Sequence, residues 1–202
     1  MNWSDENCLI RFSEAWNINF HVPPHRDAMI IKVDDDFKDK WLLYACALLN
    51  TDKEPYCSGV ELFESYDLMN WESIGFALTS SEGVPYYNPI GGFESPFVMK
   101  YGDYYYLSIT YYGYNNNVPY RSTYKNTIVF RSLEPDNPYD FGNYNGDESM
   151  IVTRLDTHAP EYIFDPETNK WYITNCGWPD MDIPFPGGVA IAELKWQKDY
   201  RK

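Results

Sequence analysis

The sequence predicts an all-β protein, and more narrowly a β-propeller of which about three blades are present. Aromatic residues make up 18% of the chain and gather with β-branched residues in short segments between turns, as is typical of strands. One pattern occurs three times: a polar residue, a small residue or proline, an apolar strand, a turn and an aromatic strand. The copies are aligned on Asp27, Glu94 and His158, 67 and 64 residues apart. A repeat built from several short strands indicates propeller blades.

Each copy supplies a hairpin, and a further strand follows it. The predicted hairpins cover 26–45, 93–108 and 157–174, and the predicted following strands cover 60–65, 128–132 and 188–194. In the second hairpin, Tyr101-Gly102-Asp103 is the tight turn, because glycine tolerates the backbone angles that such turns need. We therefore interpret 1–202 as one partial propeller domain with blade units of roughly 1–68, 69–135 and 136–202.

A shorter match continues the repeat toward the N-terminus. Met1-Asn2-Trp3 recurs as Met69-Asn70-Trp71, 68 positions later, and the second copy forms the turn between two predicted strands. The first copy has no strand before it. The sequence thus leads us to expect a chain that begins inside a blade and lacks the N-terminal blades of its parent fold.

Charge and composition exclude several classes of protein. The formal net charge is −14, which argues against nucleic acid, whose binders carry a basic surface, and against an anionic membrane surface. The sequence shows no signal peptide and no apolar run long enough to span a membrane. The four cysteines are widely spaced and leave the compartment open; Cys46, in an apolar run, is expected to be a buried small hydrophobe.

The three aligned positions are candidate functional residues. The innermost strand of each blade runs along the propeller axis, so equivalent positions converge on one pocket. A packing position would keep one shape, whereas Asp27, Glu94 and His158 share only polarity. Glu94 stands at the start of a strand beside Phe93, and a partly desolvated carboxylate there suits a general acid. An exposed acid beside a turn is the simpler alternative for Glu94, and Trp178 either stacks on a sugar or caps a blade.

With these motifs aligned, the sequence resembles the five-bladed β-propeller glycosidases, above all glycoside hydrolase family 43, and is similar to the related family 32. Arg26-Asp27 looks like the motif of the second carboxylate that orients the general acid, although Ala28 departs from the proline usual in family 32. Glu94-Ser95-Pro96 looks like the motif that carries the general acid. His158 takes the place of a family 43 histidine near the axis, which is often associated with calcium or its waters.

The resemblance implies a glycosidase that acts on O-glycosidic bonds of plant-type or fructan-type saccharides, similar to an arabinofuranosidase or xylosidase and expected to invert configuration. It implies Glu94 and Asp27 as catalytic residues, and Arg26, His158 and Trp178 as substrate-binding residues. No cofactor is required; a structural calcium ion near His158, bound through water, is left open. These families also carry a first-blade aspartate, and nothing in 1–25 resembles it. We therefore expect an incomplete enzyme with weak activity or none.

Several alternatives remain open at this stage. A non-catalytic carbohydrate-binding propeller would keep a pocket lined with aromatic residues but would not need a general acid. A family 32 β-fructofuranosidase would share the motifs, and a mannoside phosphorylase would need more basic residues than Arg26 near the repeat positions. Interaction propellers of the kelch or WD type have shorter repeats of roughly 40–50 residues. Carbohydrate is the expected partner, and self-association through exposed blade edges is also expected.

Overall fold

The computed structural model describes residues 25–34, 39–49, 57–80, 93–111, 127–137, 140–145, 147–176 and 188–197. Apart from a 3-10 turn at Glu148–Met150, the regular elements of these residues are all strands. The strands are β1 (Arg26–Asp34), β2 (Asp39–Leu49), β3 (Cys57–Ser65), β4 (Glu72–Ser80), β5 (Phe93–Tyr101), β6 (Tyr104–Tyr111), β7 (Thr127–Ser132), β8 (Gly142–Tyr144), β9 (Thr153–Leu155), β10 (Tyr162–Asp165), β11 (Lys170–Cys176) and β12 (Val189–Leu194). The all-β prediction is confirmed. Met1–Trp3 and Trp178 lie outside the described residues.

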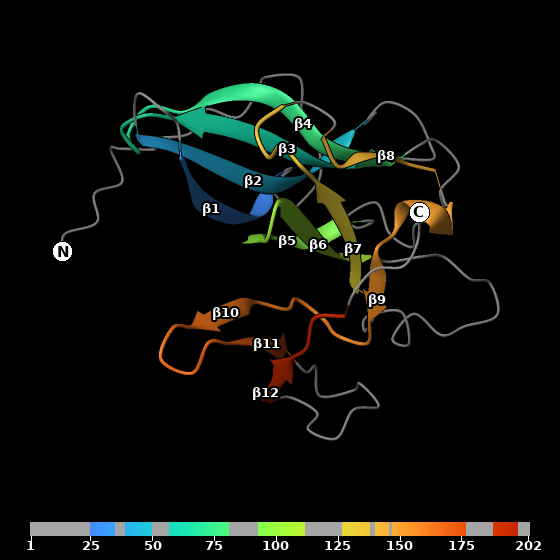
Figure 1. Cartoon of the computed structure of the whole chain (residues 1–202). Helices are drawn as coiled ribbons and strands as arrows, with labels where there is room; N and C mark the ends of the chain where they lie inside the picture. The colour runs from blue at the N-terminus through green and yellow to red at the C-terminus, as the bar shows by residue number, and fades with distance from the viewer. Residues whose placement is uncertain are drawn as a thin grey trace.

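The strands form three sheets. The first sheet has the order β1-β2-β3-β4-β8, the second β5-β6-β7-β9 and the third β10-β11-β12. Figure 1 shows the first sheet at the top, the second in the middle and the third at the bottom, and these sheets are the three blades. All neighbours are antiparallel except β4 and β8. The predicted blade units stay a prediction; the sheets do not follow the chain in simple blocks, since β8 joins the first sheet although it comes after β5, β6 and β7 of the second.

The predicted hairpin turn of the second copy is confirmed. Tyr101 pairs with Tyr104, so only Gly102 and Asp103 connect β5 to β6. Gly102 has a φ of 61°, which a residue with a side chain rarely adopts. This turn lies at the opposite end of β5 from Glu94, so the hairpin carries Glu94 and the turn at its two ends.

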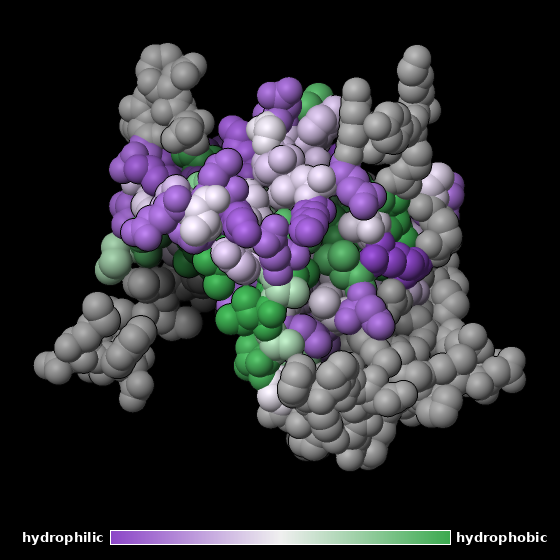
Figure 2. Space-filling model, turned by 60° about the horizontal axis from the view of Figure 1, so that its bottom comes forward, coloured by the Kyte–Doolittle hydropathy of each residue, from purple (hydrophilic) through white to green (hydrophobic). Residues whose placement is uncertain are grey.

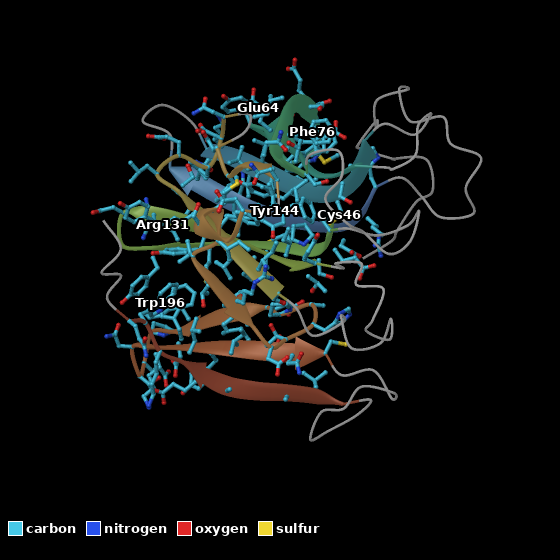
Figure 3. All side chains as sticks on the ribbon, turned by 90° about the vertical axis from the view of Figure 1, so that its right-hand side faces the viewer. Cys46, Glu64, Phe76, Arg131, Tyr144 and Trp196 are labelled. Carbon is cyan, nitrogen blue, oxygen red and sulfur yellow. The ribbon has the colours of Figure 1, made fainter. Side chains whose placement is uncertain are left out.

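The main core lies between the first and second sheets. Side chains alternate along each strand, so that Leu42, Tyr44 and Cys46 of β2 face Leu107 and Ile109 of β6 in one buried cluster. Figure 3 shows Cys46 and Tyr144 in this region. The opposite face of the first sheet has its own small buried cluster, which consists of Leu43, Ala45 and Phe63 with Trp71 packed against it. Both faces of the first sheet are therefore buried near its middle.

The third sheet packs on the second through large aromatic side chains. Phe97 of β5 contacts Tyr162 of β10 with ring centroids 5.3 Å apart. The other face of the third sheet is open to solvent. On its terminal strand β12, Val189 and Ile191 are 70% and 66% exposed. Figure 2, which brings the bottom of the Figure 1 view forward, shows a group of apolar side chains in green among mostly hydrophilic ones in purple. The predicted self-association through blade edges stays a prediction. Among the described residues, no helix is long and apolar enough to cross a membrane.

Candidate active site

The same backbone feature stands near the start of β1 and β5 and just before β10. Asp27, Ser95 and Ala159 have positive φ angles of 57°, 50° and 46°, an uncommon conformation for residues with a side chain. At this point the β1–β2 ladder skips from the Arg26–Cys46 pair to the Met29–Tyr44 pair, and the β5–β6 ladder skips in the same way after Glu94. A bulge of this kind redirects the side chain of the preceding residue toward the end of the blade.

The bulge corrects the sequence alignment of the three copies. The residue before each positive-φ position is Arg26, Glu94 or His158, so these three are equivalent, rather than Asp27, Glu94 and His158. The alignment was wrong by one residue in the first copy because Arg26 and Asp27 are adjacent polar residues and the wrong one was placed opposite Glu94; the ladder shows that Arg26 precedes the bulge. Asp27 occupies the bulge itself.

Arg26 and Glu94 meet where the first and second sheets approach each other. Arg26 Nη2 forms an ion pair with Glu94 Oε1, and Arg26 Nη1 lies 3.9 Å from Asp27 Oδ2. The Glu94 and Arg26 side chains are 15% and 26% exposed, so the pair is partly buried but open to a ligand. Burial acts to lower the pKa of Arg26, yet the charges of Glu94 and Asp27 outweigh it and raise that pKa. Arg26 is a fixed cation between two carboxylates.

Asp27 also links the two sheets through the backbone. The Ser95 N–H, directly after Glu94, donates to Asp27 Oδ2 with an N···O distance of 3.1 Å. A charged acceptor makes this a stronger bond than a neutral one would be. Asp27 therefore holds the backbone directly beside Glu94.

Cys46 is the buried neighbour of these charged side chains. It pairs with Arg26 in the β1–β2 ladder and is buried. Burial, with a contribution from the nearby Asp27 carboxylate, raises the pKa of the Cys46 thiol well above its ordinary value. A buried protonated thiol is unreactive, so Cys46 fills space beneath the charged side chains, as predicted for a small hydrophobe.

His158 is held rigidly at the equivalent position of the third sheet. It is buried, its N–H donates to Asn175 Oδ1 (2.7 Å), and its carbonyl oxygen accepts from the Cys176 N–H (3.0 Å). The next N–H, of Ala159, donates to Thr110 Oγ1 on β6 (2.8 Å). Thr110 therefore joins the second and third sheets as Asp27 joins the first and second.

The structure thus brings Arg26, Asp27 and Glu94 together, and it gives His158 the matching place one blade further on. Thr110 is not among the residues predicted from the sequence. The strand pairing identifies Thr110: it pairs with Glu94 in the β5–β6 ladder, as Cys46 pairs with Arg26 in the β1–β2 ladder. This equivalence becomes visible once the bulge is recognised.

A direct metal site does not fit the described residues. Calcium is held by several carboxylate and carbonyl oxygens, and among the described residues no group of three or more His, Cys, Asp and Glu side chains is placed to hold an ion. The water-mediated calcium near His158 stays a prediction, and no chemistry is assigned to it.

No protein-family model and no curated protein sequence matches this chain. Among solved structures, it is similar to a mutant of the glycoside hydrolase family 32 β-fructofuranosidase BmSUC1 from Bombyx mori in complex with sucrose, with a TM-score of 0.58 and 20% identity over 95% of this chain and 38% of that one. It is also similar to the exo-β-1,3-galactanase Pc1,3Gal43A of Phanerochaete chrysosporium, with a TM-score of 0.50 and 15% identity over 74% of this chain and 32% of that one. The chain thus spans about a third of the length of these neighbours.

These likenesses show the fold. The chain has the β-propeller fold of glycosidase families 43 and 32, and its three sheets correspond to part of such a propeller. The fold predicted from the three sequence motifs is confirmed.

Proposed function

We propose that this chain acts in the hydrolysis of O-glycosidic bonds, with Glu94 as general acid and Asp27 as the carboxylate that orients it. The observation that carries the proposal is the group formed by Arg26, Asp27 and Glu94, where two blades present two carboxylates around one guanidinium. The glycosidase fold supports the reaction class, because this group lies at the start of the innermost strands, where propellers hold their ligands.

In this mechanism Glu94 donates its proton to the glycosidic oxygen as the bond to the sugar carbon breaks. A second carboxylate activates water on the opposite side of the sugar, and in inverting enzymes it lies roughly 6.5–9.5 Å from the acid. We assign no residue to that second role. Asp27 holds the Ser95 N–H and thereby the backbone that carries Glu94, so its contribution is to positioning.

Arg26 controls access to Glu94. The guanidinium occupies one oxygen of Glu94, and it has further N–H donors that suit sugar hydroxyl groups. A sugar that takes over the guanidinium would free Glu94 to face the glycosidic oxygen. The equivalent positions of Arg26 and His158 on two blades support substrate-binding roles for both, whereas the role of Trp178 rests on the sequence alone.

We infer that arabinofuranosides or xylosides are the substrates and that configuration is inverted. The sucrose complex of the Bombyx mori enzyme supports a second candidate, a β-fructofuranosidase, because that protein has the higher TM-score of the two neighbours. A non-catalytic carbohydrate-binding propeller is the third candidate, since a fold does not by itself establish a reaction.

The test compares the wild-type chain with Glu94→Gln on aryl arabinofuranoside, aryl xyloside and sucrose. We expect weak turnover by this chain, which lacks a first-blade aspartate in its described sequence motifs, and Glu94→Gln should lower that kcat/KM by about 10²–10⁴-fold, the usual contribution of a general acid. Glu72→Gln changes an exposed carboxylate on β4 and serves as the matched control. Oligosaccharide binding without hydrolysis, unchanged by Glu94→Gln, would instead establish the binding propeller.

A further inference from the structure

A cavity of about 810 Å³ opens at the end of the molecule opposite Glu94. It lies between the turn of the β5–β6 hairpin and the third sheet, with Tyr101, Phe164, Trp171 and Trp196 in its lining. Glu94 and Tyr101 stand at opposite ends of β5, so the rise of a strand separates them by roughly 20 Å. Figure 3 agrees: Cys46, which pairs with Arg26, and Trp196 lie at opposite ends of the sheets. This hairpin-end cavity is distinct from the candidate active site.

Aromatic rings in the cavity hold one another in place. Tyr101 stacks on Trp196 with centroids 3.9 Å apart and planes only 4° from parallel. Trp171 stands at 83° to Trp196 and 5.3 Å from the ring of Phe164. Rings fixed by their neighbours lose little freedom when a ligand binds. Phe164 is 44% exposed, so the aromatic surface is open to solvent.

The charged residues in the lining differ from those of the whole protein. The chain has 30 acidic and 16 basic residues, yet three of the four charged residues that line the cavity are lysines. Glu193 is paired with Lys170 at 2.9 Å, and Lys195 adds a further positive charge beside them. The lining is therefore net positive on a strongly negative protein, which favours an anionic ligand over a neutral one.

We propose that the hairpin-end cavity binds an acidic oligosaccharide, in which sugar rings pack on the aromatic surface and a uronate carboxylate faces Lys195. Such a ligand has both properties that the cavity selects, namely apolar ring faces and negative charge. The volume falls within the range of small-molecule sites, about 300–1,000 Å³. The cavity would hold an acidic polysaccharide away from the site of hydrolysis. The positive charge and the aromatic rings of the cavity define the class of ligand. The proposal rests on the proposed function only for the choice of plant-type sugars.

The test is a titration with a xylotetraose that carries one glucuronic acid, followed by tryptophan fluorescence, because Trp171 and Trp196 lie in the cavity. We expect Phe164→Ala to weaken binding about tenfold, and Lys195→Gln to weaken it and reduce its salt dependence. Neutral xylotetraose should bind about tenfold more weakly than the acidic probe. Ile191→Ser changes an exposed residue of β12 that does not line the cavity, so it is the matched control and should titrate as the wild type does.

Absence of a fluorescence response in the wild type would overturn the proposal, as would equal affinity for the acidic and neutral probes. An affinity unchanged in both Phe164→Ala and Lys195→Gln would overturn it as well. Glu94→Gln should leave the titration unchanged. A chain that binds the acidic probe in this way but hydrolyses no glycoside would refute the proposed function and leave the second site standing.

Discussion

The hydrogen bond between Ala159 and Thr110 gives a sharp test of how the blades are joined. Thr110 is fully buried on β6, and its Oγ1 accepts the N–H of Ala159 at 2.8 Å. Thr110→Val keeps the shape of the side chain but removes the acceptor. An unsatisfied buried donor costs about 1–3 kcal/mol, so we expect a loss of about 2 kcal/mol in the free energy of unfolding. For a chain of this length that corresponds to a melting temperature lower by about 4–8 °C.

Urea denaturation measures this loss, with the midpoint reporting stability and the slope reporting whether unfolding stays cooperative. Thr174→Val is the matched control. Thr174 Oγ1 also accepts a backbone N–H, from Glu161 at 3.0 Å, but in an exposed setting where water replaces the lost acceptor. We expect it to cost less than about 0.5 kcal/mol. If the two variants differ by less than that amount, the hydrogen bond to Thr110 is not what joins the second and third blades.

Two further predictions concern the backbone and the alkaline limit of stability. Ala159→Gly should leave the free energy of unfolding unchanged or raise it by up to about 0.5 kcal/mol, because glycine adopts the positive φ without strain. Ala28→Gly in β1 is the control and should cost about 0.5–1 kcal/mol. Equal losses in the two variants would contradict the strain at Ala159. Burial raises the pKa of Tyr162 to about 12 from an ordinary value of 10.0. Its contribution to stability is full below pH 10 and is lost as pH rises from 10 to 12, so the wild type should lose up to about 3 kcal/mol more than Tyr162→Phe across that interval. Parallel denaturation curves of the two proteins at each pH would refute this.

The strands, the hairpins and the repeat could be predicted because their signals are local. Alternating side chains mark a strand, and Gly102 marks a turn, whatever the rest of the chain does. The motif Glu94-Ser95-Pro96 identified a candidate acid in the same way. The register of the first copy could not be obtained like this, since Arg26 and Asp27 are both polar and adjacent. The pairing with β2 decides between them.

By itself, the sequence determined the all-β propeller, the three copies and the candidate acid, because each depends on residues close together along the chain. Only the tertiary structure decided that Arg26, rather than Asp27, is the counterpart of Glu94, and that Thr110 joins two blades. It also created the hairpin-end cavity, since Tyr101 and Trp196 come from distant parts of the sequence. Contacts of this kind arise from sheet packing, which brings together side chains whose spacing along the chain carries no pattern.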